Sequence, residues 1–483
     1  MAVGITSYGA YIPLHRISRE VFYNAWGGVK MAGERSVCNF DEDSLTMATE
    51  SAIDCLTGID PKMIDGLFFA TTTAPYKEKL CASLLATVLD MRRDIRTLDV
   101  TGTTRAGTSA VATAVDVIKA GSAKSILVTS GEHRMAAPAG DFEMALGDGA
   151  AALLIGDKGV IASIEGSYTI SDEFAGMWRT DTDEFIRSWE DRMVYDKGYS
   201  DVLAEGIKGL MEKYSLSPGD ITKVVYDAPL EIRRHAQMAR TLKFEPEQVQ
   251  DPLFDTVGNT GSSLAMMMLV TTLEEAKPGD KIVFASYGNG ADAFVLQVTP
   301  QIKNVKGRRG MKNHLASKKM LENNDRYLRW RRLVPLERAR RSEQSPVSIA
   351  GLHRDRMIAL GLYGVRCKAC GTPQFSQGGS YGYFTPLRVC VECQAIDQME
   401  PYRFADKKAK VVTFTEDRLA DSPDPPTTVT VVDFEGGGRG IFDMTDRGAA
   451  EIQVGMDVEM TFRKLFSDRG IHNYFWKTRP IRC

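Results

Sequence analysis

Over residues 1 to about 300, short apolar runs rich in β-branched residues alternate with segments of helical spacing. Continuous apolar runs of four to eight residues are typical of strands that are buried on both faces. Buried strands that alternate with helices predict a layered α/β fold. The clearest strand runs are Gly66–Ala70, Ser125–Ser130, Ala150–Ile155, Lys223–Tyr226 and Lys281–Ser286, and the clearest helical segments are Gly107–Lys119 and Ser262–Glu275.

The same region contains three pairs of similar segments in the same order. A segment that reads AGSAKSILVTSG returns later as PGDKIVFASYG, and GDGAAALLIG returns as GNGADAFVLQV. An earlier pair is DPKMIDGLFFA and SPGDITKVVYD. Three matches in one order predict two similar α/β halves.

From about residue 345 the pattern changes. A helix-like segment, Ile349–Leu362, precedes a cysteine cluster, and short alternating runs separated by turns follow. Such spacing predicts a small β-barrel. We therefore expect four parts: an α/β domain over 1–300, a linker over 301–344, a helix and zinc ribbon over 345–400, and a barrel over 401–483. The barrel runs are Lys410–Thr415, Thr427–Phe434, Gly440–Met444, Asp457–Arg463 and His472–Lys477.

Composition narrows the class of protein. The 483 residues are 43% hydrophobic and 25% charged, with a net charge of −3. This composition excludes a disordered chain and argues against a globally basic nucleic-acid binder. We find no apolar run long enough to span a membrane, and the start MAVGITSYGAYIP lacks the features of a secretory signal. We expect a cytoplasmic protein that binds neither nucleic acid nor membrane.

The segment 301–341 departs from this balance, because it holds 14 Lys and Arg against 3 Asp and Glu. A solvated linker is one interpretation. The alternative is a segment that binds an anion or docks a partner, for instance the nucleotide phosphate of a carrier. The run Arg329-Trp330-Arg331-Arg332 mixes cations with an aromatic ring, which would also suit stacking on a base.

Four cysteines form two pairs with two-residue gaps, Cys367 with Cys370 and Cys390 with Cys393, separated by nineteen residues. This is the spacing of a zinc ribbon, in which four thiolates close a tetrahedral site. The alternatives are two disulfides, which are disfavoured in a chain without a secretory signal, or two redox pairs. Because four thiolates leave no open position, the zinc would be structural. Cys38, Cys55 and Cys81 follow no such pattern and are expected to be packing residues.

Several motifs resemble the hydroxymethylglutaryl-CoA synthases of the thiolase superfamily. These motifs are GITSYGAYIP, GERSVCNFDEDSLTMATESA, RAGTSA, GNTGSSL and SYGNGADAF. The C-terminal part, with VGMDVEMTFRK, resembles the zinc-ribbon OB-fold proteins that accompany thiolase-like partners. The resemblance implies a duplicated five-layer αβαβα fold, a homodimer and an acyl-CoA thioester as substrate, with an OB-like barrel fused at the C-terminus.

The catalytic positions of that family are occupied by other residues here. The resemblance places the nucleophilic Cys at Thr104, the His at Asp227 and the general-base Glu at Thr72, whereas the Asn is retained as Asn259. A threonine hydroxyl needs a strong adjacent base before it can attack a thioester, so an acyl-enzyme at Thr104 is disfavoured. Backbone N–H groups at Thr104 and in the SYGNG turn would still form the family's oxyanion hole.

The candidate site residues are therefore Asp227, Asn259, Thr104, Tyr287 and Tyr76. Asp227 is the candidate general base, with an ion pair or turn cap as the structural alternative. Tyr76, Tyr226 and Tyr287 could move the proton of a substrate hydroxyl, although each could equally be a packed aromatic. Asn259 could orient a water molecule or the thioester oxygen.

Three functions fit these residues. The leading hypothesis is a lyase or synthase that acts on the carbon–carbon bond of a β-hydroxyacyl-CoA by retro-aldol chemistry, without an acyl-enzyme. The others are a condensing acyltransferase of the hydroxymethylglutaryl-CoA synthase type and a non-catalytic acyl-CoA-binding subunit. A partner enzyme of acyl-CoA metabolism is compatible with all three.

Overall fold

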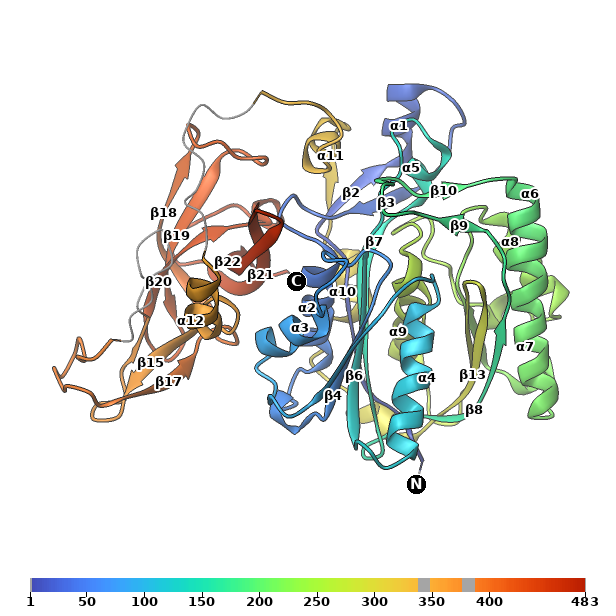
Figure 1. Cartoon of the computed structure of the whole chain (residues 1–483), viewed down its shortest axis with the longest axis horizontal. Helices are drawn as coiled ribbons and strands as arrows, with labels where there is room; N and C mark the ends of the chain where they lie inside the picture. The colour runs from blue at the N-terminus through green and yellow to red at the C-terminus, as the bar shows by residue number, and fades with distance from the viewer. Residues whose placement is uncertain (1, 338–347, 376–386, 483) are drawn as a thin grey trace. The chain divides into compact units, whose positions relative to one another are not determined.

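A computed structural model describes residues 2–337, 348–375 and 387–482 of the chain (Figure 1). Its contacts divide the chain into two units. Unit 1 contains Met1–Cys38 and Asp43–Asn324, and unit 2 contains Asn39–Glu42 and Asp325–Cys483. None of the helices in the described ranges combines the length and the apolar content needed to cross a membrane.

Unit 1 is built on one mixed sheet of nine strands, in the order β11-β12-β13-β8-β1-β7-β6-β4-β5. Its central strands are buried on both faces, and all nine residues of β7 are buried. The predicted apolar runs form strands of this sheet. They are continuously apolar because helices cover both sides of the sheet. The strands are β1 (Gly4–Tyr11), β4 (Gly66–Ala70), β5 (Arg96–Val100), β6 (Ser125–His133), β7 (Asp148–Gly156), β8 (Ala162–Ser171), β11 (Lys223–Tyr226), β12 (Lys281–Tyr287) and β13 (Gly290–Val298).

The predicted duplication appears in the strand pairing. β4 pairs parallel with β6, and β6 pairs antiparallel with β7. In the second half β11 pairs parallel with β12, and β12 pairs antiparallel with β13. Each repeated sequence segment thus forms the same element in its own half, which confirms the expectation of two similar halves.

Helices form the other layers of unit 1. Figure 1 shows α4 (Ala106–Lys119) and α9 (Leu264–Glu275) in the middle of the unit, with α2 (Ser44–Cys55) and α3 (Cys81–Val88) on one outer side and α7 (Val202–Lys213) and α8 (Arg233–Thr241) on the other. In α9 the apolar side chains from Leu264 to Val270 are all buried, as expected for a helix that is covered on all sides. Both central helices begin near the carboxyl ends of neighbouring strands, and this is where the cavity described below lies.

The segment predicted as a basic linker is structured where it is described. Residues 301–324 belong to unit 1 and include α10 (Gly310–Ala316) and β14 (Lys319–Leu321). β14 extends the small sheet of β2 (His15–Ser18) and β3 (Glu34–Val37) through a parallel pairing with β2. Residues 338–344 of the predicted linker lie outside the described residues.

Unit 2 begins with α11 (Asp325–Trp330). Trp330 is buried and donates from Nε1 to the Pro423 carbonyl at 3.2 Å, and Arg329 donates to the Ser422 carbonyl at 2.7 Å. The Arg-Trp run therefore packs within unit 2. Because Trp330 is buried there, the structure favours neither a solvated linker nor base stacking at Trp330.

The predicted barrel is present as a closed five-stranded barrel in the order β18-β19-β20-β22-β21. Helix α12 (Ile349–Ala359) precedes a three-stranded sheet that carries the cysteine cluster. The barrel strands are β18 (Ala409–Asp417), β19 (Thr427–Phe434), β20 (Arg439–Met444), β21 (Asp457–Asp468) and β22 (Ile471–Pro480), and the small sheet contains β15 (Tyr363–Cys367), β16 (Pro373–Gln374) and β17 (Met399–Arg403).

A buried ionic cluster lies at the middle of β21 and β22 within unit 2. Arg463 has no exposed side-chain surface and contacts Glu42 and, at 2.8 Å, Asp446. Lys477 donates to Asp41 at 2.9 Å. The two carboxylates of the segment Asn39–Glu42 thus neutralise cations that come from residues more than four hundred positions later.

Candidate functional site

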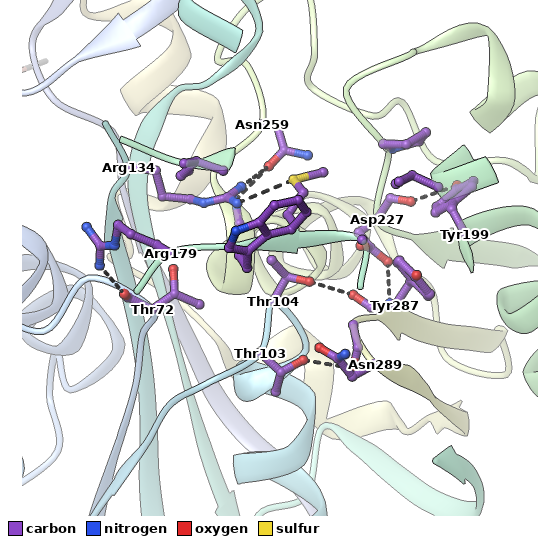
Figure 2. A pocket seen from close by; sticks show the side chains of 18 of the residues that line it. Thr72, Thr103, Thr104, Arg134, Arg179, Tyr199, Asp227, Asn259, Tyr287 and Asn289 are labelled. Atoms are coloured by element: carbon purple, nitrogen blue, oxygen red, sulfur yellow. Dashed lines mark hydrogen bonds between the residues drawn. The ribbon is translucent and has the colours of Figure 1, made fainter. Parts of the chain in front are cut away.

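A cavity of about 280 Å³ opens in unit 1 beside the start of α4. Its walls come from the segment before α4, the ends of β6 and β11, the turn between β12 and β13, and a loop near residues 174–195 (Figure 2). Four of the five predicted site residues line it: Thr104, Asp227, Asn259 and Tyr287. Tyr76 does not line it, and its ring lies under the Lys79 ammonium group at 4.9 Å.

Asp227 follows directly after β11 and is buried. Its Oδ1 accepts a hydrogen bond from the Tyr287 N–H at 2.9 Å. Burial raises the pKa of Asp227 from 3.8 to about 7, and the hydrogen bonds from Tyr287 and Ser286 only partly offset this effect. A carboxyl group with a pKa near neutrality can both accept and return a proton, which is the property a general acid–base requires.

Two tyrosines lie next to Asp227. The Tyr199 hydroxyl donates to the Asp227 backbone carbonyl at 2.9 Å, and the Tyr199 ring packs edge-on against Tyr287 with centroids 5.8 Å apart. Among the described residues the Tyr287 hydroxyl has no hydrogen-bond partner, and a Cβ at Gly198 would lie 2.5 Å from it. Gly198 therefore leaves the space that this hydroxyl occupies. Burial raises the pKa of Tyr287 to about 12, so Tyr287 is a proton donor at neutral pH.

Thr104 lies two residues before α4, at the position of the family's nucleophile. Its hydroxyl donates to the Tyr287 carbonyl at 2.9 Å, and the Thr103 hydroxyl donates to the Gly288 carbonyl at 2.8 Å (Figure 2). A Cβ at Gly288 would lie 2.7 Å from the Thr104 hydroxyl oxygen, so only glycine permits this close approach. Because the Thr104 proton is directed to a backbone carbonyl and not to a base, nothing here activates the hydroxyl for attack.

The SYGNG turn differs from the expected oxyanion hole. The Tyr287 N–H donates to Asp227, and the Gly288 N–H donates to the Gly290 carbonyl at 3.0 Å. Both N–H groups are therefore used within the protein. The turn serves instead to position Asp227 and the two threonine hydroxyls.

Thr72, at the position of the family's Glu, contacts a carboxylate that the sequence analysis did not identify. Glu132 is buried, and its oxygens accept from the Thr72 N–H at 2.7 Å and the Thr72 hydroxyl at 3.0 Å. Thr73 and Ser262 donate to the same carboxylate at 2.8 and 2.5 Å. With four donors around it, Glu132 holds this wall of the cavity in place and does not line the cavity itself.

Asn259 is buried and connects the part of the cavity wall that follows β11 with the part that follows β6. Its Nδ2 donates to the Ala228 carbonyl at 2.8 Å, and its Oδ1 accepts from the Gly261 N–H at 2.9 Å and from Arg134 at 3.2 Å. Gly261 has a φ of +56°, and a Cβ there would lie 2.7 Å from the Arg134 Cδ. The glycine of the GNTGSS motif thus makes room for Arg134, a cavity residue that the sequence analysis missed.

The remaining candidates lie outside this cavity. Tyr226 is fully buried, donates to the His235 carbonyl at 2.8 Å and packs against the His235 ring. Cys38, Cys55 and Cys81 are buried, and burial raises the pKa of Cys55 and of Cys81 to about 12. These three positions are consistent with packing, as expected.

The four cysteines of unit 2 come together. Their Sγ atoms lie within 4.8 Å of one another, and the distances Cys367–Cys393 and Cys370–Cys390 are 3.7 and 3.5 Å. A tetrahedral zinc site with bonds of about 2.3 Å places its sulfurs about 3.8 Å apart. Gly371 adopts a φ of +79° directly after the first pair, as the predicted tight turn requires. The donor set and its spacing therefore fit a structural zinc ion.

Comparisons with known proteins place both units. Residues 211–298 match the family described as 3-oxoacyl-[acyl-carrier-protein] synthase III C terminal, and residues 402–463 match the family described as ChsH2, C-terminal OB-fold domain. The hydroxymethylglutaryl-CoA synthase of Methanopyrus kandleri is 34% identical over 316 residues, which cover 63% of this chain and 90% of that protein. The corresponding enzyme of Caldivirga maquilingensis is 30% identical over 349 residues, which cover 70% of this chain and 99% of that protein.

Solved structures share the fold of unit 1. The crystal structure of 3-oxoacyl-[acyl-carrier-protein] synthase III from Aquifex aeolicus has a TM-score of 0.55 at 20% identity and covers 61% of this chain and 99% of its own. The structure described as MvaS in complex with 3-hydroxy-3-methylglutaryl coenzyme A has a TM-score of 0.60 at 20% identity, with 71% and 95% covered. The predicted duplicated α/β fold and the C-terminal OB-fold unit are both confirmed.

Proposed function

The chain belongs to the hydroxymethylglutaryl-CoA synthase family of the thiolase superfamily, and on this premise we propose that it makes or breaks the carbon–carbon bond of a β-hydroxyacyl-CoA without an acyl-enzyme. The observation that carries the proposal is that the family's catalytic positions in the cavity are occupied by different functional groups in this chain. A carboxyl group with a pKa of about 7, Asp227, faces a cavity in which the threonine at the nucleophile position donates its proton to a carbonyl.

In the cleavage direction, Asp227 removes the proton of the β-hydroxyl group. The O–H electron pair then forms a C=O bond, and the Cα–Cβ bond breaks with its electron pair moving into the thioester enolate. The enolate takes a proton from Asp227 or Tyr287, which yields a shorter acyl-CoA and an aldehyde or ketone. The reverse sequence of steps would join the same two products.

The enolate oxygen needs donors within the cavity. Because the Tyr287 and Gly288 N–H groups are engaged, the Thr104 N–H, which precedes α4, is the backbone donor of the expected oxyanion hole that we propose for the enolate. In well-studied enzymes a single such donor contributes about 3 kcal/mol to the stabilisation of the charged intermediate. Asn259 would orient the substrate, and its hydrogen bonds to Ala228 and Gly261 would hold its amide group in position for this role.

Two other functions remain as alternatives. A condensing acyltransferase of the hydroxymethylglutaryl-CoA synthase type is favoured by the family, whose relatives carry that name. A non-catalytic acyl-CoA-binding subunit is favoured by the exchange of all three residues at Thr104, Asp227 and Thr72.

The deciding experiment combines intact-protein mass spectrometry with product analysis after incubation with acyl-CoA and β-hydroxyacyl-CoA thioesters. The proposal predicts release of an aldehyde or ketone and a shorter acyl-CoA, with no mass added to the protein. A stable acyl adduct would contradict it and support the acyltransferase. Binding without adduct or product would support the subunit.

We further propose a structural zinc ion at Cys367, Cys370, Cys390 and Cys393, where it would join the two cysteine pairs of the ribbon. We also propose a homodimer, because β5 is the edge strand of the sheet in unit 1 and Leu98 on it is 36% exposed. A partner enzyme of acyl-CoA metabolism and a cytoplasmic location remain part of the hypothesis.

A further inference from the structure

A second group of metal-ligating side chains lies in unit 1, apart from the zinc ribbon and the cavity. It consists of Cys38, His133 and Asp148, and one ligand atom from each residue lies within 4.8 Å of the others. None of the three lines the cavity. Cys38 and Asp148 are 2% and 0% exposed, whereas His133 is half-buried, so the group is enclosed except on the side of His133. The burial of Cys38, which also fits a packing residue, is what a thiolate ligand of a closed site requires.

Strand pairing brings these three residues together. His133 is the last residue of β6 and Asp148 is the first residue of β7, and the two are direct partners in the antiparallel pairing, so their side chains share one face of the sheet. Cys38 follows directly after β3, and its N–H donates to Asp148 Oδ2 at 2.8 Å. The neighbouring Glu132 accepts from Thr72 in the cavity wall. Because side chains alternate along a strand, His133 points away from that wall.

Hydrogen bonds fix the backbone at these positions. The His133 N–H donates to the Thr73 hydroxyl at 3.0 Å, and the Asp148 N–H donates to the Ser36 hydroxyl at 2.8 Å. A carboxylate that accepts the Cys38 N–H with one oxygen can bind a metal ion with the other, and such a hydrogen bond orients the ligand. The three ligands therefore come from rigid, hydrogen-bonded segments at the ends of three strands.

The donor set determines which ion would fit. Thiolate and imidazole ligands favour Zn²⁺ and similar transition-metal ions, whereas Mg²⁺ and Ca²⁺ prefer sites made of oxygen ligands. A divalent ion that is bound by one thiolate, one carboxylate and one neutral imidazole carries no net charge together with its ligands. This neutrality offsets the cost of burying the two anionic groups. Three protein ligands leave the fourth position of a tetrahedral site to a water molecule.

We propose that Cys38, His133 and Asp148 bind a second, exchangeable divalent cation of the zinc class. The inference does not depend on the proposed function, because the three residues lie outside the cavity. Three protein ligands hold an ion less tightly than four thiolates, so we expect protein purified without added metal to carry zinc in the ribbon alone. Cys38 directly precedes Asn39–Glu42, so the ion would fix the chain at the point where it passes from unit 1 into unit 2.

The test is a titration of the purified full-length protein with Co²⁺, which gives a thiolate-to-metal charge-transfer band when a cysteine binds it. We expect one equivalent of Co²⁺ to produce this band, while a zinc-sensitive dye detects no release of the ribbon zinc. The band should be absent in Cys38→Ser, and in His133→Gln the affinity for Co²⁺ should fall at least about 10-fold. Cys81→Ala is the matched control, because it removes another buried cysteine and should titrate as the wild type does.

Four outcomes would overturn the proposal. The first is a wild type without the band at about 1 mM Co²⁺, an affinity too weak for a built site. The second is a band that persists in Cys38→Ser, and the third is a band accompanied by release of the ribbon zinc, which would assign Co²⁺ to the ribbon. The fourth is displacement of Co²⁺ by an equal concentration of Mg²⁺, which would contradict the class of ion. If Cys38→Ser does not fold, His133→Gln decides, and an unchanged affinity for Co²⁺ would overturn the site.

Discussion

Replacement of Asp227 by asparagine tests the central group of the site without the need for a substrate. Asparagine keeps the shape of the side chain and an oxygen that can accept the Tyr287 N–H, but it cannot ionise. In the folded wild type the Asp227 pKa is raised from 3.8 to about 7, so the folded protein binds this proton more tightly than the unfolded chain does. The stability that comes from this proton is complete below pH 3.8 and is lost as the pH rises through about 7.

The size of the effect follows from the two pKa values. At about 1.36 kcal/mol per pH unit, the difference between 3.8 and about 7 corresponds to about 4 kcal/mol of unfolding free energy. This value is an upper limit, because water entry or relaxation around a buried charge would reduce it. Relative to the wild type, Asp227→Asn should therefore become more stable as the pH rises from 5 to 8, by about 1–3 kcal/mol, because the part of the effect between pH 3.8 and pH 5 is already complete at the start of this range.

The assay is urea unfolding of the wild type and Asp227→Asn at pH 5, 6, 7 and 8, with tryptophan fluorescence as the signal. Asp94→Asn serves as a control, because Asp94 is exposed. Only the difference between variants at each pH is used, so stability changes common to all proteins cancel. A difference between the wild type and Asp227→Asn that stays constant within about 0.5 kcal/mol from pH 5 to 8 would refute the buried, proton-binding carboxyl.

Three further predictions concern the nucleophile position, the zinc ribbon and the sheet edge. Thr104→Cys should show neither an acyl adduct by mass spectrometry nor a higher kcat/KM, because no base faces that position; an acyl-cysteine would instead indicate a latent synthase. Elemental analysis should find one zinc per chain in the wild type and in the control Cys81→Ala but none in Cys370→Ser; equal zinc in all three proteins would exclude the ribbon site. Leu98→Lys on β5 should convert a dimer to a monomer by light scattering, and a monomeric wild type would contradict the proposed dimer.

The sequence predicted those parts of the fold that depend on local apolar patterning. β4, β11 and β19 have the residue limits that the runs suggested, because each is a short run between clear turns. The last residues of β21, 464–468, and of β22, 478–480, were missed, since neither segment is an apolar run. The end of β21 pairs with the start of β22, and the buried end of β22 pairs with the start of β21. Pairing between strands, not composition, determines where such strands end.

The site was predicted in part. Thr104, Asp227, Asn259 and Tyr287 come from four separate segments, and the fold brings all of them to one cavity. The sequence could not show that Glu132 accepts from Thr72, or that Arg134 contacts Asn259, because these partners are 60 and 125 residues apart.

One clue to the missed residues was present in the sequence. The GEHR segment follows an apolar run and places two charged residues, Glu132 and Arg134, at the end of a predicted strand. A charge at the end of a buried strand requires a partner, and its identity depends on the tertiary structure.

The position of Asn39–Glu42 in the sequence limits how the two units could be expressed separately. The OB-fold unit uses Asp41 and Glu42 to neutralise Lys477 and Arg463, yet those two acids precede the rest of the unit, which begins at Asp325, by more than 280 residues. A truncated gene that begins at Asp325 would express a barrel in which Lys477 lacks Asp41 and Arg463 keeps only Asp446. Removal of one partner of a buried pair typically costs about 3–5 kcal/mol. During synthesis on the ribosome, the same unit cannot complete its charge pairing until β22, the last strand, has emerged. The OB-fold unit therefore needs a segment that lies within the sequence of the other unit, although each unit resembles a family of its own.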